Sequence, residues 1–142
     1  MNILIIDAQG GGIGRQLVSA VRETIPGAEI TAVGTNSVAA AAMRKAGADH
    51  TATGENAVVV ACRRADVILG PIGIVIADAL YGEITPAMAA AVGQSRARRI
   101  LIPFNHCDNI LVGVSNLSVS ALLQETTELL RQLAAGGAAP TV

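Results

Sequence analysis

Aromatic residues are almost absent from this 142-residue chain, which has one tyrosine, one phenylalanine and no tryptophan. Tyr81 and Phe104 offer little surface on which single-stranded bases can stack. Lysine is also scarce, since Lys45 is the only one, and ten Lys and Arg residues face eleven Asp and Glu residues for a net charge of -1. A near-neutral chain has no strong attraction to a phosphate backbone. The composition therefore predicts that nucleic acid is not a partner.

Long apolar runs are missing too. The longest uncharged apolar run, between Asp66 and Asp78, is interrupted by Gly70, Pro71 and Gly73. It is well short of the roughly 20 residues that a membrane helix needs. The chain enters a predicted strand at Asn2, without a basic leader and a small-residue cleavage site. We therefore expect a soluble, cytoplasmic protein with no membrane partner.

Cysteine is rare, and Cys62 and Cys107 are too few for a disulfide framework or a four-cysteine zinc site. Cys107 lies in the cluster Asn105-His106-Cys107-Asp108, which holds three groups capable of metal binding or catalysis. Neighbours in sequence seldom have the geometry of a catalytic pair, although a site with His and Cys ligands is not excluded. We predict no metal centre and expect both cysteines to behave as small apolar residues.

Apolar residues make up 51% of the chain and charged residues only 15%, which favours a buried core. Apolar runs predict strands at 2–6, 28–33, 66–69, 99–102 and 110–114, with one short strand within 49–56. Helical spacing and capping residues predict helices at 13–25, 37–47, 57–64, 85–94 and 119–133.

Alternating strands and helices indicate a parallel sheet covered on both faces. Right-handed crossovers limit the winding to Rossmann-like or flavodoxin-like topologies. We predict an α/β fold: a single doubly wound, Rossmann-like, three-layer domain over residues 1–135, with a mostly parallel sheet of five or six strands. Residues 136–142 are expected to form a flexible tail.

A glycine-rich turn connects the first predicted strand to the first predicted helix. In doubly wound folds the ligand binds at the carboxyl ends of the strands, where the helix offers unpaired N–H groups. We predict that a phosphate or nucleotide binds Asp7, Gln9, Gly10, Gly11, Gly12, Ile13 and Gly14. The dinucleotide pattern G-x-G-x-x-G is incomplete, because Arg15 stands in the third glycine position counted from Gly10. A tight turn without a ligand is the alternative.

Two further features bear on the cofactor. The Asp7 carboxylate has three candidate roles: accepting a hydrogen bond from a ribose or sugar hydroxyl, holding Mg²⁺ beside a phosphate, or capping the first helix. The second strand ends in Gly34-Thr35-Asn36, without the acidic residue that NAD-binding domains usually place there. These donors fit the 2′-phosphate of NADP, although no arginine accompanies them. We expect NAD(P) or another nucleotide, with Gly70 and Pro71 completing the crevice.

Two other carboxylates lie in turns expected to reach this crevice. Glu55 and Glu83, together with Asp7, are candidate proton-transfer groups for an enzyme acting on a small phosphorylated metabolite. Solvated turn carboxylates are the alternative. The sequence has no phosphate-loop lysine motif, no G-x-S-x-G and no H-E-x-x-H, so an ordinary ATPase, serine hydrolase or zinc protease is not predicted.

A third hypothesis is a ligand-free interaction protein. Residues 72–80 and 85–94 carry more apolar surface than one small domain readily covers. We therefore expect a homodimer or a larger homo-oligomer.

Several short motifs occur in a fixed order: Ile6-Asp7-x-Gln9-Gly10-Gly11-Gly12-Ile13-Gly14, Gly34-Thr35-Asn36, Thr53-Gly54-Glu55-Asn56-Ala57, Gly70-Pro71-Ile72-Gly73 and Gly82-Glu83-Ile84-Thr85-Pro86-Ala87-Met88-Ala89. With these motifs the chain resembles a family of short bacterial proteins of unknown function, common in Clostridia-type anaerobes. The resemblance implies a Rossmann-like fold and a cytoplasmic bacterial setting, but no substrate, reaction or catalytic residue. Ala8 replaces a glycine of the family, and the segment with His106 is variable, which argues against a shared role for His106.

Overall fold

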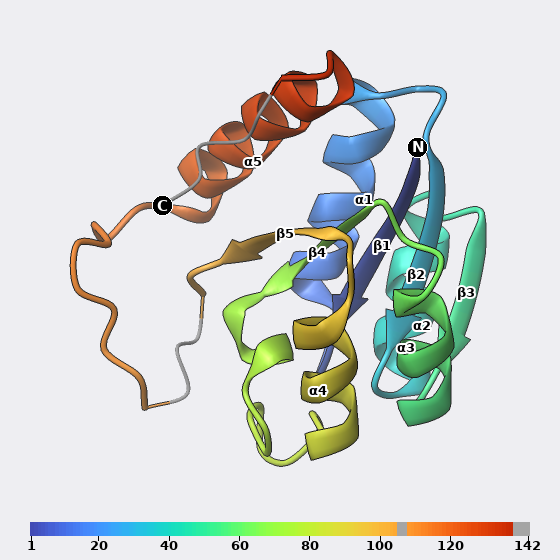
Figure 1. Cartoon of the computed structure of the whole chain (residues 1–142), viewed down its shortest axis with the longest axis vertical. Helices are drawn as coiled ribbons and strands as arrows, with labels where there is room; N and C mark the ends of the chain where they lie inside the picture. Colours follow the sequence, from blue (N-terminus) through green and yellow to red (C-terminus); the bar gives the residue numbers. More distant parts are fainter. Residues whose placement is uncertain (105–107, 138–142) are drawn as a thin grey trace.

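The computed structural model describes residues 1–104 and 108–137. In these residues five strands form one sheet: β1 (Asn2–Asp7), β2 (Glu29–Gly34), β3 (His50–Thr53), β4 (Val67–Pro71) and β5 (Arg98–Ile102). The helices are α1 (Gly12–Thr24), α2 (Ser37–Lys45), α3 (Glu55–Cys62), α4 (Pro86–Gln94) and α5 (Val119–Ala134), with a 3₁₀ helix η1 (Ile72–Val75). The strand order is β3-β2-β1-β4-β5, and all neighbouring strands are parallel (Figure 1). The predicted doubly wound α/β fold is confirmed.

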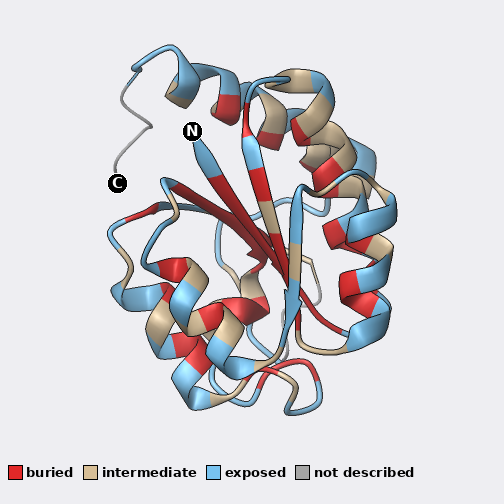
Figure 2. Ribbon diagram, turned by 90° about the vertical axis from the view of Figure 1, so that its right-hand side faces the viewer, coloured by how far each residue is buried: buried red, intermediate tan, exposed pale blue. Residues whose placement is uncertain are grey.

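The sheet is buried between two layers of helices, as Figure 2 shows. Along β1, Ile3 and Ile5 join a core with α1, α2 and α5, whereas Leu4 and Ile6 join a second core with α3 and α4. Side chains of a strand alternate between the two faces, so a strand covered on both sides must be apolar at consecutive positions. The continuous apolar run that predicted β1 has this physical cause.

Three helices begin at the capping residues that helix termini require. The side chains of Asn36, Thr85 and Ser118 accept hydrogen bonds from the backbone amides of Ala39, Met88 and Ala121. Each bond satisfies one of the N–H groups that have no partner within the helix. Pro86 follows Thr85 at the first helical position, where its missing N–H costs nothing.

Two sequence expectations are wrong. Residues 110–114 form no strand: Ile110 and Val112 are 93% and 98% exposed, and positive φ angles at Asp108 and Gly113 interrupt the extended backbone. The surplus of apolar surface expected on 72–80 and 85–94 is absent as well, because Ile74 and the α4 residues Met88 and Val92 pack in the core that these segments share with α3 and the sheet. No described helix combines the length and the apolar character that crossing a membrane requires. His106, Cys107 and the last five residues of the predicted tail lie outside the described residues.

Candidate functional site

The glycine-rich turn between β1 and α1 lies where the strand order reverses. The chain passes from β1 to β2 and β3 on one side, and then crosses to β4 and β5 on the other. Doubly wound sheets bind their ligands at this switch point, outside the carboxyl ends of the strands. A cavity of about 190 Å³ is present there. It is lined by Asp7, Ala8, Gln9, Gly10, Gly11, Gly12, Ile13, Gln16, Pro71, Leu80, Phe104 and Val119.

The Asp7 carboxylate supports the turn from inside. Its Oδ1 accepts a hydrogen bond from the Ala8 amide at 2.8 Å, and its Oδ2 accepts one from the Gly14 amide at 2.6 Å. Burial raises the pKa of Asp7, the nearby Glu83 charge adds to the rise, and the Gly14 and Ala8 amides oppose it. Of the roles expected from the sequence, the geometry supports helix capping, because both carboxylate oxygens are engaged by backbone amides.

Three backbone amides of the turn have no partner in the described part of the chain: those of Gly10, Gly12 and Ile13. The other amides are occupied, since Gly11 donates to the Ala8 carbonyl at 3.0 Å and Arg15 donates to the Gly11 carbonyl at 2.9 Å. Free N–H groups at a helix start carry partial positive charge. This end of the cavity therefore presents hydrogen-bond donors.

The four glycines of the turn fall into two pairs. Gly11 has φ +73°, and a Cβ there would lie 2.8 Å from the Ala39 Cα; a Cβ on Gly14 would lie 2.7 Å from the Asp7 Cβ and 2.6 Å from the Met43 Sδ. The fold requires glycine at both of these positions. A Cβ on Gly10 or Gly12 would meet nothing within 4 Å, and neither residue has a positive φ. Neither the turn nor the packing requires glycine at these two positions.

The β2 side of the crevice is closed by Glu83. Its Oε2 accepts from the Gln9 amide at 2.9 Å, and its Oε1 accepts from Asn36 Nδ2 at 2.8 Å and from Thr35 Oγ1 at 3.2 Å. Asn36 Nδ2 also donates to the Gln9 carbonyl at 2.9 Å. The structure thus joins Glu83 to Thr35 and Asn36, two residues expected to contact a cofactor.

The remaining predicted site residues have other surroundings. Gly34 and Gly70 serve close packing, because a Cβ at either would lie 2.5 Å from a backbone atom, Ala40 N and Ile6 O respectively. Pro71 lines the cavity. Glu55 is exposed at the start of α3 and is not part of the cavity wall.

Besides Ala8 within the turn, four residues of the cavity wall were not predicted from the sequence. These residues are Gln16, Leu80, Phe104 and Val119. They are single residues on a helix, in an irregular loop, after a strand and at a helix start, with no motif to mark them. Only the three-dimensional structure brings them together.

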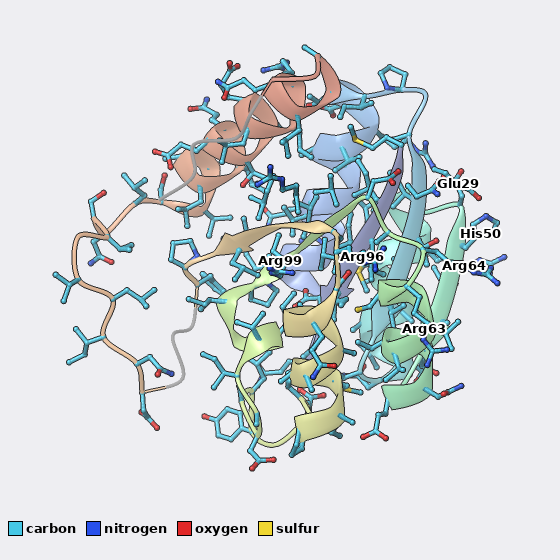
Figure 3. The ribbon with its side chains drawn as sticks, viewed as in Figure 1. Glu29, His50, Arg63, Arg64, Arg96 and Arg99 are labelled. Carbon is cyan, nitrogen blue, oxygen red and sulfur yellow. The ribbon has the colours of Figure 1, made fainter. Side chains whose placement is uncertain are left out.

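Among the described residues that line this cavity there is no lysine or arginine. Figure 3 labels Glu29, His50, Arg63, Arg64, Arg96 and Arg99. All six lie in or just before strands that begin at the opposite end of the sheet from the glycine turn. The hydrogen-bond donors that the residues lining the cavity offer are backbone amides and the side-chain amides of Gln9 and Gln16.

Three larger hollows lie away from the glycine turn, with volumes of about 450, 520 and 690 Å³. They lie between α1 and α5, beside α3 over β2 and β3, and between α3 and α4. Alanines make up much of the walls of the second and third. In the second hollow, the polar residues His50 and Glu29 contact each other, with His50 Nε2 2.9 Å from Glu29 Oε1.

The described residues contain no group of three His, Cys, Asp or Glu side chains placed to hold a metal ion. Asp7 is the carboxylate expected to bind Mg²⁺, and it already accepts two amide hydrogen bonds.

The fold and the turn together define a small doubly wound α/β domain with a glycine-rich strand-to-helix connection. The chain belongs to a family described as a domain of unknown function, DUF3842, whose model matches residues 2–135. The expected resemblance to an uncharacterised family is confirmed at this level. No curated protein matches the sequence.

Two solved structures are similar in fold. One is the Escherichia coli heptosyltransferase WaaC with ADP, with a TM-score of 0.51 and 15% sequence identity. The match covers 100% of this chain and 49% of the heptosyltransferase, so this chain spans about half of that protein. A dodecameric FMN-dependent UbiX-like decarboxylase from Escherichia coli O157:H7 has a TM-score of 0.46 and 20% identity, and the match covers 97% of this chain and 77% of that one. At these identities the likeness describes the fold alone.

Proposed function

We propose that the protein binds a small phosphorylated molecule, with the phosphate at the amides of Gly10, Gly12 and Ile13. These amides lie at the start of α1, where N–H groups and the helix dipole favour an anion. The position at the strand switch point and the adjoining cavity support the same assignment.

The observation that carries the proposal is the contrast among the glycines. The fold requires glycine at positions 11 and 14, because a side chain there would collide with neighbouring atoms. Gly10 and Gly12 face open space, so the fold would accept a side chain at either position. A glycine without a conformational or packing role is explained where a ligand must approach the backbone closely. Both of these glycines line the cavity.

The geometry favours binding over acid–base catalysis by the expected carboxylates. Asp7 accepts two backbone hydrogen bonds, and Glu83 accepts three hydrogen bonds from the protein. Glu55 is exposed and lies outside the cavity wall. A general acid or base must come within hydrogen-bond reach of the proton that it transfers, whereas the observed contacts of Asp7 and Glu83 hold the turn and its surroundings in place.

Thermal stability measured against a panel of phosphorylated ligands tests the proposal. A ligand that binds only the native state raises the melting temperature. The panel contains inorganic phosphate, sugar phosphates, nucleoside phosphates and NAD(P). We expect at least one phosphorylated member to stabilise the wild-type protein.

The same panel is measured on Gly12→Val, whose side chain would enter the space left for the ligand. The matched control is Gly93→Val, because Gly93 also faces open space but lies on α4, away from the cavity. We expect Gly12→Val to lose the ligand response and Gly93→Val to keep it. Stabilisation that survives in Gly12→Val would place the ligand elsewhere and refute the assignment.

A further inference from the structure

Glu83 places a carboxylate at the corner where dinucleotide-binding domains hold the adenosine ribose. That corner is the carboxyl end of β2, where Thr35 and Asn36 present hydrogen-bond donors. Both donors are directed at Glu83, and the Gln9 amide is directed at it too. A ligand phosphate there would have to compete with the protein's own anion, and like charges repel strongly where water is partly excluded.

The loop that carries Glu83 has a costly backbone conformation. Asp78, Leu80 and Tyr81 have φ angles of 64°, 56° and 59°, and Gly82 has φ 80°. Residues with side chains rarely adopt this left-handed region. The loop is closed by the bond from the Asp78 amide to the Ile84 carbonyl at 2.8 Å. The same loop supplies buried Leu80 to the cavity wall, so one structural unit shapes the cavity and fills the β2 corner.

Part of the cavity wall is apolar. Pro71, Leu80, Phe104 and Val119 contribute uncharged side chains, and the cavity of about 190 Å³ is smaller than the roughly 300–1,000 Å³ of typical ligand sites. A full dinucleotide would have to extend beyond this volume, and a 2′-phosphate on its β2 side would meet the Glu83 carboxylate. A compact ligand meets neither obstacle.

We infer that Glu83 is the specificity-determining residue of the proposed site. It restricts the ligand to a compact molecule with one phosphate group, whose uncharged body lies against Leu80, Phe104 and Val119. It excludes ligands that place a second phosphate at the end of β2. This inference rests on the proposed phosphate-binding function.

Calorimetric titration with inorganic phosphate, NAD and NADP tests the inference on the full chain. We expect wild type to bind phosphate and to bind NADP only weakly, because the 2′-phosphate of NADP would lie beside the Glu83 carboxylate. NAD has no phosphate at that position and serves as the comparison. Glu83→Ala should keep the phosphate affinity and bind NADP about tenfold or more tightly than wild type does, because its β2-end donors are released. Glu83→Gln retains the shape of the side chain and serves if Glu83→Ala does not fold. The matched control Glu55→Ala removes an exposed carboxylate of another turn and should behave as wild type.

The outcomes separate the two proposals. If wild type binds phosphate but Glu83→Ala and Glu83→Gln gain no affinity for NADP, the role of Glu83 is refuted and the phosphate site stands. Tight binding of NADP to wild type refutes the role of Glu83 as well. If wild type binds none of the phosphorylated probes, the proposed function fails and the inference fails with it.

Discussion

The Oδ2 atom of Asp7 lies 2.6 Å from the backbone nitrogen of Gly14 and accepts its hydrogen bond. The last residue of β1 therefore holds the first turn of α1 in place. The contact is close enough that Gly14 has no room for a side chain. The acid at the end of β1 and the fourth glycine of the turn form one structural unit.

Replacing Gly14 should therefore destabilise the protein, whereas replacing Gly12 should not. The Cβ of Gly14→Ala would overlap the Asp7 Cβ and the Met43 Sδ, and such overpacking costs about 1–3 kcal/mol. Gly12→Ala has open space and a helical position, where alanine is favoured over glycine by about 0.5–1 kcal/mol. Chemical denaturation of both variants measures the difference. Equal stability of the two variants would contradict the division of the glycines.

The stability of the fold should depend on pH through Asp7. Its folded-state pKa lies above the ordinary value of 3.8, so the folded protein keeps a proton that the unfolded chain releases. The contribution of Asp7 to stability is fully present below pH 3.8 and is lost as the pH rises through the raised folded-state pKa. We expect wild type, compared with Asp7→Asn, to gain stability as the pH falls from neutral toward 3.8.

The contribution of Asp49 to stability has the opposite pH dependence to that of Asp7 and changes in a lower pH range. The ion pair with Arg22 and the Ile30 amide lower the pKa of Asp49 below 3.8, so its contribution is lost only as the pH falls beneath that value. Asp49 is present in both wild type and Asp7→Asn, so its contribution cancels when the two unfolding free energies are compared at the same pH. A difference in unfolding free energy that does not change with pH would contradict the assignment to Asp7.

The fold was predictable because its signals are local. The apolar run of β1, the spacing in α1 and the Thr85-Pro86 start of α4 each reflect a requirement of one element. The strand predicted at 110–114 failed because strand formation needs a neighbour, and this segment has the composition of a strand without a place in the sheet. The hydrogen bonds of Glu83 with Gln9 and Asn36 could not be predicted either. These three residues are far apart in sequence, and only the folded chain brings them together.

Asn36 should contribute more to stability than an ordinary helix cap. It caps α2 through the Ala39 amide, as Thr85 caps α4, but its side-chain amide also binds the Gln9 carbonyl and Glu83. Losing a cap costs about 1 kcal/mol, and the extra bonds should bring Asn36→Ala to about 2 kcal/mol. Thr85→Ala is the matched control in urea denaturation. A smaller loss in Asn36→Ala than in Thr85→Ala would contradict the bridging role.

Cys62 should be unreactive in the native protein. Burial raises the pKa of its thiol to about 11, so very little thiolate exists at neutral pH, and the side chain is 4% exposed. Peptide mapping after treatment with iodoacetamide should find Cys62 modified in denaturant and unmodified without it. Equal labelling in both conditions would show that the core between α3 and α4 does not protect this residue.

The homo-oligomer expected from the sequence remains a prediction, and four of the exposed large apolar side chains that would favour it lie within 108–118. Ile110 and Val112 are 93% and 98% exposed. Val112→Asp should weaken self-association in static light scattering. Val38→Asp, at a 63% exposed position on α2, should leave self-association unchanged. A monomeric wild type would contradict the prediction.

The central claim is that the free amides of the glycine turn bind phosphate, and an NMR titration of isotope-labelled protein with inorganic phosphate tests it most directly. The account predicts saturable shifts of the Gly10, Gly12 and Ile13 amide signals. The Gly11 and Arg15 amides, which already donate to the backbone, should shift less. Phosphate that leaves these three signals unmoved, or that moves only signals elsewhere in the chain, would contradict the account.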